Sequence, residues 1–141
     1  MFSKSCEYAI KSIIYIESNG VDSRKIKLNE IANAIDSPVA FTAKILQQLK
    51  KSGLLISTID TKGGFHIEKN RPITLKEIVI AIDGDGFFNK CVLGLKVCSP
   101  SNPCPAHETY KIIKENLTQD LLDLKLDDFT KKIKNKSITL K

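Results

Sequence analysis

Residues 28–53 constrain the fold more than any other stretch, because they predict two short helices joined at a tight turn. Apolar side chains recur at helical spacing in LNEIANAI at 28–35 and again in VAFTAKILQQLKKS at 39–52. Between them, Ser37 is expected as an N-cap and Pro38 as the first helical residue. Two helices joined in this way, the second basic at its end, predict a helix-turn-helix.

The segments on either side complete the outline of a winged domain. Residues 3–18 carry an apolar stripe at i, i+3 and i+4 spacing and predict an amphipathic helix before the pair. After the pair, residues 54–67 predict a two-stranded hairpin, the wing, with turn residues at 60–64. Thr74 and Glu77 form an expected capping box, which opens a further helix that ends at the sequence DGDG.

The C-terminal part predicts an irregular loop and then a dimerisation helix. CVLGLKVCSPSNPCPAH at 91–107 holds three of the chain's four cysteines and has little regular structure of its own. From about Pro105 a long helix is expected, followed by a short lysine-rich tail. The helix needs a partner for its apolar stripe, and a second copy of the chain is the expected one. The stripe consists of Ile113, Leu117, Leu121 and Leu124.

These elements give a mainly α fold with a small β-hairpin wing. We expect a winged helix-turn-helix DNA-binding domain at 1–84, a cysteine-rich cluster-binding loop at 85–107, and a dimerisation helix with its tail at 108–141. The length of the chain suits one modest hydrophobic core rather than two independent ones.

Charge and apolar content narrow the class of protein. The 141 residues include 22 Lys and Arg against 16 Asp and Glu, and the net charge of +6 suits a polyanionic partner. Charged residues interrupt the N-terminal apolar residues, unlike a secretory signal, and no apolar run reaches the length of a membrane span. We therefore expect a cytoplasmic protein without a membrane partner, whose reduced cysteines serve metal or redox chemistry.

A DNA-binding surface is expected on the second helix of the pair and on the wing. The side chains expected to approach a major groove lie on early turns of that helix: Ser37, Ala40, Phe41, Thr42 and Lys44. The lysines expected to pair with phosphates are Lys50, Lys51 and Lys62. Gly63 and Gly64 form either a wing tip that approaches a groove or a plain β-turn. In the alternative interpretation, Phe41 belongs to the core and the lysines form an ordinary solvated face.

The cysteine segment gives the sharpest chemical signal. Six residues separate Cys91 from Cys98, five separate Cys98 from Cys104, and two separate Cys104 from His107. Thiolates and imidazole are ligands for zinc and for iron-sulfur clusters. Structural zinc sites usually include a closely spaced cysteine pair, which this segment lacks, so the spacing favours a cluster over zinc. Unrelated reduced cysteines are the third interpretation.

Other reactive side chains do not indicate catalysis. Cys6 lies on the apolar stripe of the first predicted helix and is expected in the core. Glu7, beside it, is expected to pair with Lys11 one turn later. An enzyme with a reactive Cys98 or Cys104 is disfavoured, because no oxyanion or substrate-pocket motif accompanies these residues.

Taken together, these motifs resemble the winged-helix repressor family that includes the iron-sulfur regulator IscR and the nitric-oxide-responsive repressor NsrR. The resemblance runs from SCEYAIKSIIYI through the helix pair and the wing sequence KGGF to the three cysteines and the helix after them. It implies that the long C-terminal helix dimerises, that the loop holds a two-iron or four-iron cluster, and that the winged domains bind a palindromic operator.

The resemblance also implies the ligands of the cluster. Cys91, Cys98 and Cys104 match the three cluster thiolates. CPAH is similar to the IscR-type pattern, in which the histidine after the third cysteine coordinates, so His107 is the preferred fourth ligand. Glu7 is the second choice, because it falls where NsrR-type members place an acidic ligand that reaches over from the other subunit.

The chain departs from the family pattern on the DNA-binding side. Ile59 and Asp60 stand where many members have an arginine and a glycine at the wing, and the nearest basic residue is Lys62. Ala43 stands where IscR carries a glutamate that discriminates bases. The resemblance therefore implies DNA binding, but not the operator preference of IscR.

The sequence as a whole predicts a homodimeric transcription regulator, expected to be a repressor and not an enzyme. Its operator affinity would be controlled by an iron-sulfur cluster that senses redox state, nitric oxide or cluster status. The alternative is a winged-helix interaction module whose loop is stabilised by zinc and does not sense through a cluster.

Overall fold

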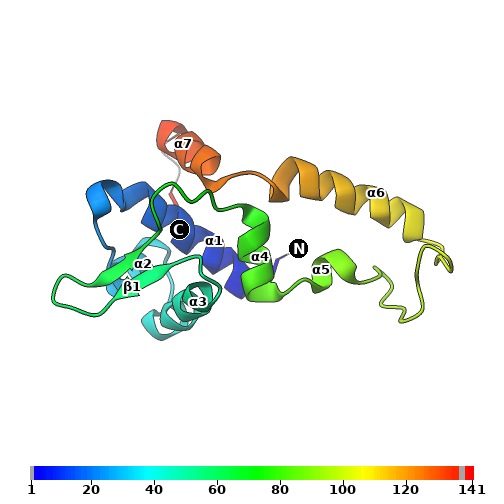
Figure 1. Ribbon diagram of the computed structural model, residues 1–141, viewed down its shortest axis with the longest axis horizontal. Helices are drawn as coiled ribbons and strands as arrows, with labels where there is room; N and C mark the ends of the chain where they lie inside the picture. Colours follow the sequence, from blue (N-terminus) through cyan, green and yellow to red (C-terminus); the bar gives the residue numbers. More distant parts are fainter. Residues whose placement is uncertain (1, 137–138) are drawn as a thin grey trace.

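The computed structural model describes residues 2–136 and 139–141 (Figure 1). Its elements in chain order are α1 (Lys4–Asn19), the 3-10 turn η1 (Val21–Ser23), α2 (Leu28–Ala34), α3 (Val39–Lys51), β1 (Ile56–Thr58), β2 (Gly64–His66), α4 (Leu75–Asp83), α5 (Gly86–Asn89), α6 (His107–Leu117), the π-helical turn η2 (Thr118–Leu122) and α7 (Leu126–Lys136). The predicted mainly helical fold with one antiparallel hairpin is confirmed.

Helix α1 is the centre of the core because its apolar stripe is buried along its whole length. Cys6, Ala9, Ile13 and Ile16 are at most 1% exposed. The helix begins where the Ser3 hydroxyl accepts a hydrogen bond from the Cys6 amide, an N-cap that satisfies one of the free amides of the first turn. The expected burial of Cys6 is confirmed, and burial raises the pKa of its thiol to about 12.

The predicted helix pair forms, but its turn differs from the expected one. Asp36 takes a left-handed conformation with φ 52° between the two helices. The N-cap position of α3 is occupied by Pro38 rather than by Ser37. The Ser37 hydroxyl is buried and has no hydrogen-bond partner among the described residues. The sequence signal was misread because Asp36 makes the turn, which shifts the helix start by one residue.

The wing is a short hairpin that a third segment holds in place. Ile56 pairs with His66 and Thr58 with Gly64 in antiparallel register. Ile26, from the segment before α2, forms a further bridge with Phe65. Gly64 packs against this segment so closely that a Cβ there would lie 2.7 Å from the Ile26 carbonyl oxygen. The backbone contact therefore requires glycine at this position.

Helix α4 has the capping box that the sequence predicts. The Glu77 amide donates to the Thr74 hydroxyl, and the Thr74 amide donates to the Glu77 carboxylate at 2.8 Å. The helix ends at Gly84, whose φ of 77° breaks the helical path. The chain then passes through α5 into the cysteine segment.

The C-terminal third differs from the single long helix that was expected. Helix α6 begins at His107, and the helical path breaks after η2. Residues 126–136, predicted as a tail, form α7, which lies against α1 (Figure 1). Leu122 and Leu126 are fully buried, and the Leu126 amide donates to the Ile73 carbonyl at 2.8 Å. These two leucines return the chain to the core.

The molecule thus has two regions. We call residues 2–83 together with 122–136 the winged body, and residues 86–117 the arm. The arm contains α5, the irregular segment at 90–106 that we call the cysteine loop, and α6, and it extends away from the wing (Figure 1). In the part of the chain that the structure describes, no helix is both long enough and apolar enough to cross a membrane.

Candidate functional site

The cysteine loop brings its three thiols together. The Sγ atoms of Cys91, Cys98 and Cys104 all lie within 4.8 Å of one another. Cys91 and Cys104 are in direct contact, with 3.5 Å between their sulfur atoms. Cys98 lies 3.2 Å from Nδ1 of His107, the first residue of α6. The structure therefore places four predicted ligands in contact as two adjoining pairs.

Local turns create this convergence. Cys91 comes two residues after the last residue of α5, and the Gly94 amide donates back to its carbonyl at 2.9 Å. A tight turn in which Ser99 and Asn102 exchange backbone hydrogen bonds separates Cys98 from Cys104. The His107 amide then donates to the Cys104 carbonyl at 3.0 Å, which starts α6 beside the last thiol.

Cys91 and Cys104 differ in acidity because backbone hydrogen bonds dominate at one and burial at the other. Hydrogen bonds from the amides of Leu95 and Leu93 lower the pKa of Cys91 to about 7. Burial raises the pKa of Cys104 instead. Amides that point at a sulfur stabilise its negative charge, so Cys91 is the thiol best prepared to be a thiolate ligand or nucleophile.

The donor set fits a thiophilic metal. Sulfur atoms bound to one tetrahedral zinc ion at about 2.3 Å are roughly 3.8 Å apart, close to the Cys91–Cys104 separation of 3.5 Å. A four-iron cluster takes its cysteines on separate irons, so this loop would have to spread the sulfur atoms to hold one, whereas two cysteines can share one iron of a two-iron cluster. The irregular backbone of the loop permits that movement.

A small cavity of about 230 Å³ adjoins the sulfur atoms. Its lining includes the side chains of Lys90, Lys111 and Lys114. The Lys114 ammonium donates to the Phe88 carbonyl at 2.9 Å, which fixes one positive charge at the root of the arm. Ammonium groups beside the sulfur atoms would offset the negative charge of several thiolates.

Glu7 lies on α1 and has a different partner from the expected one. Its carboxylate forms an ion pair with Lys4 at 2.9 Å, and this hydrogen bond lowers the pKa of Glu7. The predicted partner, Lys11, lies over the Tyr8 ring instead, 5.4 Å from its centroid. Helix geometry permits both spacings, and the sequence pattern could not distinguish them.

The predicted DNA-contacting residues of α3 divide into exposed and buried groups. Ala40 and Lys44 are exposed, as are Lys50 and Lys51 near the helix end. Thr42, by contrast, is fully buried, and its hydroxyl donates to the Pro38 carbonyl at 3.0 Å, so its predicted exposure was wrong.

Phe41 and Ser37 also lie further inside than expected. The Phe41 ring packs edge-on against Tyr8, with 5.6 Å between the ring centroids, and it borders the main core. Ser37 is half-buried. Only small or basic side chains of the predicted set therefore remain available on the surface of α3.

One residue of the exposed α3 surface was missed. Gln47 is exposed between Lys44 and Lys51, and these side chains line one shallow hollow together with Ala43 and Gln48. The sequence pattern could have predicted that Gln47 is exposed, because positions 40, 44, 47 and 51 recur at helical spacing on the face opposite the buried stripe.

Gln48 has a structural role beside this hollow. Its amide donates to the carbonyls of Ala81 and Ile82 at 3.1 and 3.3 Å. These carbonyls belong to the last turn of α4, which leads into the arm. Direct hydrogen bonds therefore join α3 to the last turn of α4, the turn that precedes the arm.

The wing tip is apolar as well as basic. Lys62 is exposed, whereas Gly63 and Gly64 are half-buried in the turn. Ile59 is 99% exposed, and Asp60 lies 3.9 Å from the Lys25 ammonium. The Lys25 charge offsets that of Asp60, which would otherwise repel a phosphate backbone.

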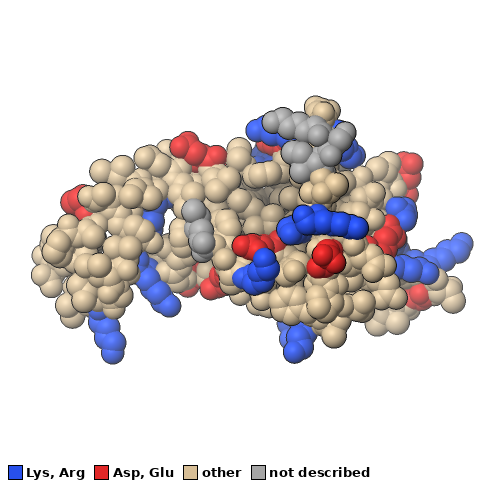
Figure 2. Space-filling view, turned by 180° about the vertical axis from the view of Figure 1, so that it is seen from behind, with Lys and Arg blue, Asp and Glu red and all other residues tan. Residues whose placement is uncertain are grey.

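The arm exposes apolar side chains that the winged body does not cover. On α6, Ile112 and Ile113 are more than half exposed, whereas Leu117 and Leu121 pack against the buried cluster around Leu122. The exposed members in the cysteine loop are Val92, Leu93, Leu95 and Val97. On the face shown in Figure 2, the arm consists mostly of residues other than Lys, Arg, Asp and Glu. Of the expected stripe, only Ile113 in the middle of α6 is therefore mostly exposed, while Leu117, Leu121 and Leu124 are half-buried.

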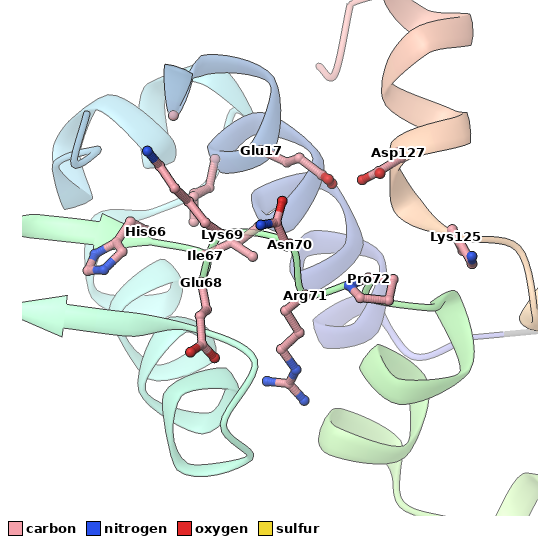
Figure 3. Close-up of a pocket in the computed structure, with 12 residues that line it drawn as sticks. Glu17, His66, Ile67, Glu68, Lys69, Asn70, Arg71, Pro72, Lys125 and Asp127 are labelled. Carbon is pink, nitrogen blue, oxygen red and sulfur yellow. The ribbon is translucent and has the colours of Figure 1, made fainter. Parts of the chain in front are cut away.

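A second, larger cavity of about 430 Å³ lies in the winged body, away from the cysteine loop. Its lining comes from α1, the segment after β2 and the start of α7 (Figure 3). The carboxylates of Glu17 and Asp127 point toward each other across it. Burial, together with Asp127, raises the pKa of Glu17 to about 8. The pair therefore binds α7 to α1 most firmly when it carries a proton.

Comparison with known proteins identifies relatives along nearly the whole chain. The model of a family described as "Rrf2: iron-dependent transcriptional regulator" matches residues 2–132. A protein of Aquifex aeolicus named as an HTH-type transcriptional regulator is 31% identical over 121 residues, which cover 83% of this chain and 82% of that protein. A Rhodobacter capsulatus protein named as rrf2-like is 29% identical over 87 residues, 60% of this chain and 58% of that one.

Solved structures agree in fold. CymR, the global cysteine regulator of B. subtilis, superimposes with a TM-score of 0.75 at 19% identity, covering 93% of this chain and 96% of its own. IscR of T. potens superimposes with the same TM-score at 16% identity, covering 99% and 92%. At these identities the likeness concerns the winged-helix fold alone.

Proposed function

The chain belongs to the Rrf2 family of transcriptional regulators, and from this premise we propose that it is a homodimeric DNA-binding repressor controlled by an iron-sulfur cluster in its cysteine loop. The observation that carries the proposal is the convergence of three cysteine sulfur atoms within 4.8 Å, outside the winged body. Membership in a family of regulators also places the chain outside the enzymes.

We assign DNA contact to the exposed surface of α3 and to the wing. Small and amide side chains, Ala40 and Gln47, can approach base edges in a major groove, and Gln is suited to bidentate hydrogen bonds with adenine. The basic residues that would contact phosphates are Lys44, Lys50, Lys51 and Lys62. Gly63 and Gly64 keep the backbone of the wing compact. A dimer of such domains binds a palindromic operator, with half-sites about one helical turn apart.

The cluster ligands are Cys91, Cys98 and Cys104, with His107 as the fourth. His107 is preferred because its imidazole already contacts Cys98 at 3.2 Å. Glu7 remains the competing ligand, and it would come from the second copy of the chain, since its own helix holds it near Lys4. When bound, a cluster supplies redox and nitric oxide sensitivity that the protein side chains lack.

Dimerisation would use the apolar surface of the arm. Ile112 and Ile113 lie side by side on α6, and neither has a covering residue in the winged body. Large exposed apolar side chains in one region mark interaction sites. A second copy presents the same residues, so a two-fold arrangement buries both sets together.

Metal occupancy can then alter DNA affinity through the end of α4, which connects α3 to the arm. The Gln48 amide joins α3 to the last turn of α4, and α4 leads through Gly84 into the cysteine loop. A change of 100-fold in operator affinity requires only about 2.7 kcal/mol of coupling. A few contacts remade in the loop and the dimer interface can supply that energy.

Anaerobic purification tests the cluster. We expect brown protein with the absorption and Mössbauer spectra of an iron-sulfur cluster, and we expect Cys98→Ser to lose the colour. Cys6→Ala is the matched control, because Cys6 is buried in the winged body, and this variant should stay brown. Undetectable binding to duplex DNA at low salt, in both metal-free and metal-loaded protein, would refute the regulator itself.

One observation favours zinc as a second candidate. The Cys91–Cys104 sulfur separation of 3.5 Å fits a single ion better than a four-iron cluster. In that case the loop is a structural metal site, and the winged body binds its partner without cluster sensing. Stoichiometric zinc in colourless, anaerobically purified protein would establish this alternative and exclude the cluster.

A further inference from the structure

We propose that the metal-free protein carries a second, covalent redox site, in which hydroperoxide oxidation joins Cys91 and Cys104 in an intramolecular disulfide. This site goes beyond metal binding, because it requires only the thiols of the cysteine loop. In the metal-free protein, its formation does not depend on which metal, if any, the loop would otherwise bind. Its effect on metal loading, described below, rests on the proposed metal site.

The positions of the sulfur atoms favour Cys91 and Cys104 as the disulfide pair. The two sulfur atoms are 3.5 Å apart, whereas Cys98 contacts the His107 imidazole at 3.2 Å. Cys91 and Cys104 are both partly exposed, so a small oxidant can reach them. Cys6 is 0% exposed in the core and lies outside this chemistry.

The loop can close the bond without disturbing the winged body. A disulfide has a sulfur–sulfur length of about 2.05 Å, so the two atoms must approach by roughly 1.5 Å. Side-chain rotation and small backbone shifts provide this movement in a loop that has turns but no helix between Cys91 and Cys104. Gly94, with φ 69°, is a flexible point between them.

The chemistry balances in two steps. The Cys91 thiolate attacks one oxygen of the hydroperoxide, the O–O bond breaks, and Cys91 becomes a sulfenic acid while the other oxygen leaves as water or an alcohol. The Cys104 thiolate then attacks the Cys91 sulfur atom, the S–O bond breaks, and the oxygen leaves as water after protonation. One hydroperoxide is reduced by two electrons, and two thiols are oxidised to one disulfide.

The disulfide would withdraw two of the three sulfur ligands. Oxidised protein could not take up metal until a dithiol reduced it, so the redox state of the thiols would decide whether an empty site can be loaded. This control acts on the metal-free form, and it is separate from any response of a bound cluster.

Peptide mapping tests the proposal directly. Metal is removed with a chelator, the protein is treated with hydrogen peroxide, remaining thiols are alkylated, and the chain is cut with trypsin. Cleavage after Lys90, Lys96 and Lys111 gives CVLGLK with Cys91 and VCSPSNPCPAHETYK with both other loop cysteines. We expect these two peptides to be joined, while SCEYAIK, which carries Cys6, is alkylated.

Matched variants identify the partner, because Cys98 and Cys104 share one peptide. The joined peptides should persist in Cys98→Ser and disappear in Cys104→Ser. A joined product that disappears in Cys98→Ser instead, a bond confined to VCSPSNPCPAHETYK, or oxidation to sulfinic acid without any bond would overturn the proposal. A product found only between two chains would overturn it as well.

Cobalt(II) uptake separates this proposal from the proposed metal site. Thiolate-to-cobalt absorption should appear with reduced protein, disappear with the oxidised protein, and return after dithiothreitol. If the disulfide forms but reduced protein never binds cobalt or iron, the metal site fails and the disulfide stands. If reduced protein binds cobalt but no disulfide forms, the reverse holds.

Discussion

The winged body and the arm differ in where their apolar side chains lie. In the winged body, α1, α3 and α4 each bury apolar residues, and Leu122 and Leu126 add to this core from the C-terminal side. In the arm, α5 and α6, both fully described, contain no buried residue. The winged body is stabilised by its own hydrophobic core, whereas the arm needs stabilising contacts from outside itself.

The difference shows where control can act. A region with few buried contacts opens at low free energy, so its structure responds to ligands and partners. The arm holds the cysteine sulfur atoms and the uncovered apolar residues, which in the proposed function would be completed by metal and by a second chain. The winged body can keep its DNA-contacting surface folded while the arm changes state.

The largest expected contrast is in folding stability. Leu46→Ala removes a fully buried side chain of α3 and should lower the free energy of unfolding by about 3 kcal/mol. Leu93→Ala in the cysteine loop, where the side chain is 55% exposed, should change it by less than about 0.5 kcal/mol in dilute metal-free protein. Urea denaturation measures both. Equal losses would mean that the arm has a core of its own.

Self-association, unlike folding stability, should depend on the arm and not on the winged body. Ile113→Asp on α6 should weaken dimerisation at least about 100-fold, or roughly 2.7 kcal/mol, because it places a charge in the buried contact. Ile80→Asp on α4 is the matched control, since Ile80 is also a partly exposed isoleucine but belongs to the winged body. Sedimentation velocity over a concentration series compares them. Dissociation by Ile80→Asp alone would move the interface to the winged body.

DNA affinity should depend on lysines of the winged body and not on lysines of the arm. Lys51→Ala on α3 should weaken binding by about 1 kcal/mol and reduce the slope of log affinity against log salt by about 0.9. Lys96→Ala removes an exposed lysine of the arm that does not line the cavity beside the sulfur atoms, and it should leave both quantities unchanged. Fluorescence anisotropy with one duplex at several salt concentrations gives the slopes. A reduced slope for Lys96→Ala would show that the arm touches DNA.

The smallest effect concerns pH and is confined to the winged body. Glu17 has a native pKa of about 8 against an ordinary value of 4.5, so the native state holds its proton more tightly than the unfolded state. Its contribution to stability is complete below the unfolded pKa and is lost as pH rises toward the native value. Glu17→Gln should therefore raise the free energy of unfolding by about 1 kcal/mol near pH 8 and change little near pH 5.

Glu108→Gln provides the control for this titration, because Glu108 is an exposed acid on α6. Its pH profile of stability should match that of the unmodified protein. A Glu17→Gln profile that kept the full decline between pH 5 and pH 8 would assign the decline to other groups.

The sequence predicted the winged body well because local signals and burial agree there. The stripe of α1, the capping box at Thr74 and the pairing of the wing strands each follow from spacing that a single element determines. The break before α7 was missed, because the apolar spacing of Leu117, Leu121 and Leu124 continues across it. What ends the helix is a tertiary contact, the backbone pairing of Ile73 with Leu126.

The candidate site was predictable in its composition and less so in its arrangement. Residue types and spacing were enough to select the three loop cysteines and His107, which the structure brings together. Exposure on α3 was predicted less well, since Thr42 and Phe41 turn inward while Gln47 faces outward. The identity of the metal depends on how far the sulfur atoms spread, and no sequence spacing specifies that distance.

Topologically, the arm interrupts the winged body rather than extending from its end. The chain leaves the winged body where α4 ends at Asp83, returns to the core at Leu122, and then forms α7 against α1. A segment fixed at both ends cannot swing freely, so a change in its shape must act on the two attachment points together. A change in the shape of the arm is therefore felt both at the end of α4 and at the start of α7.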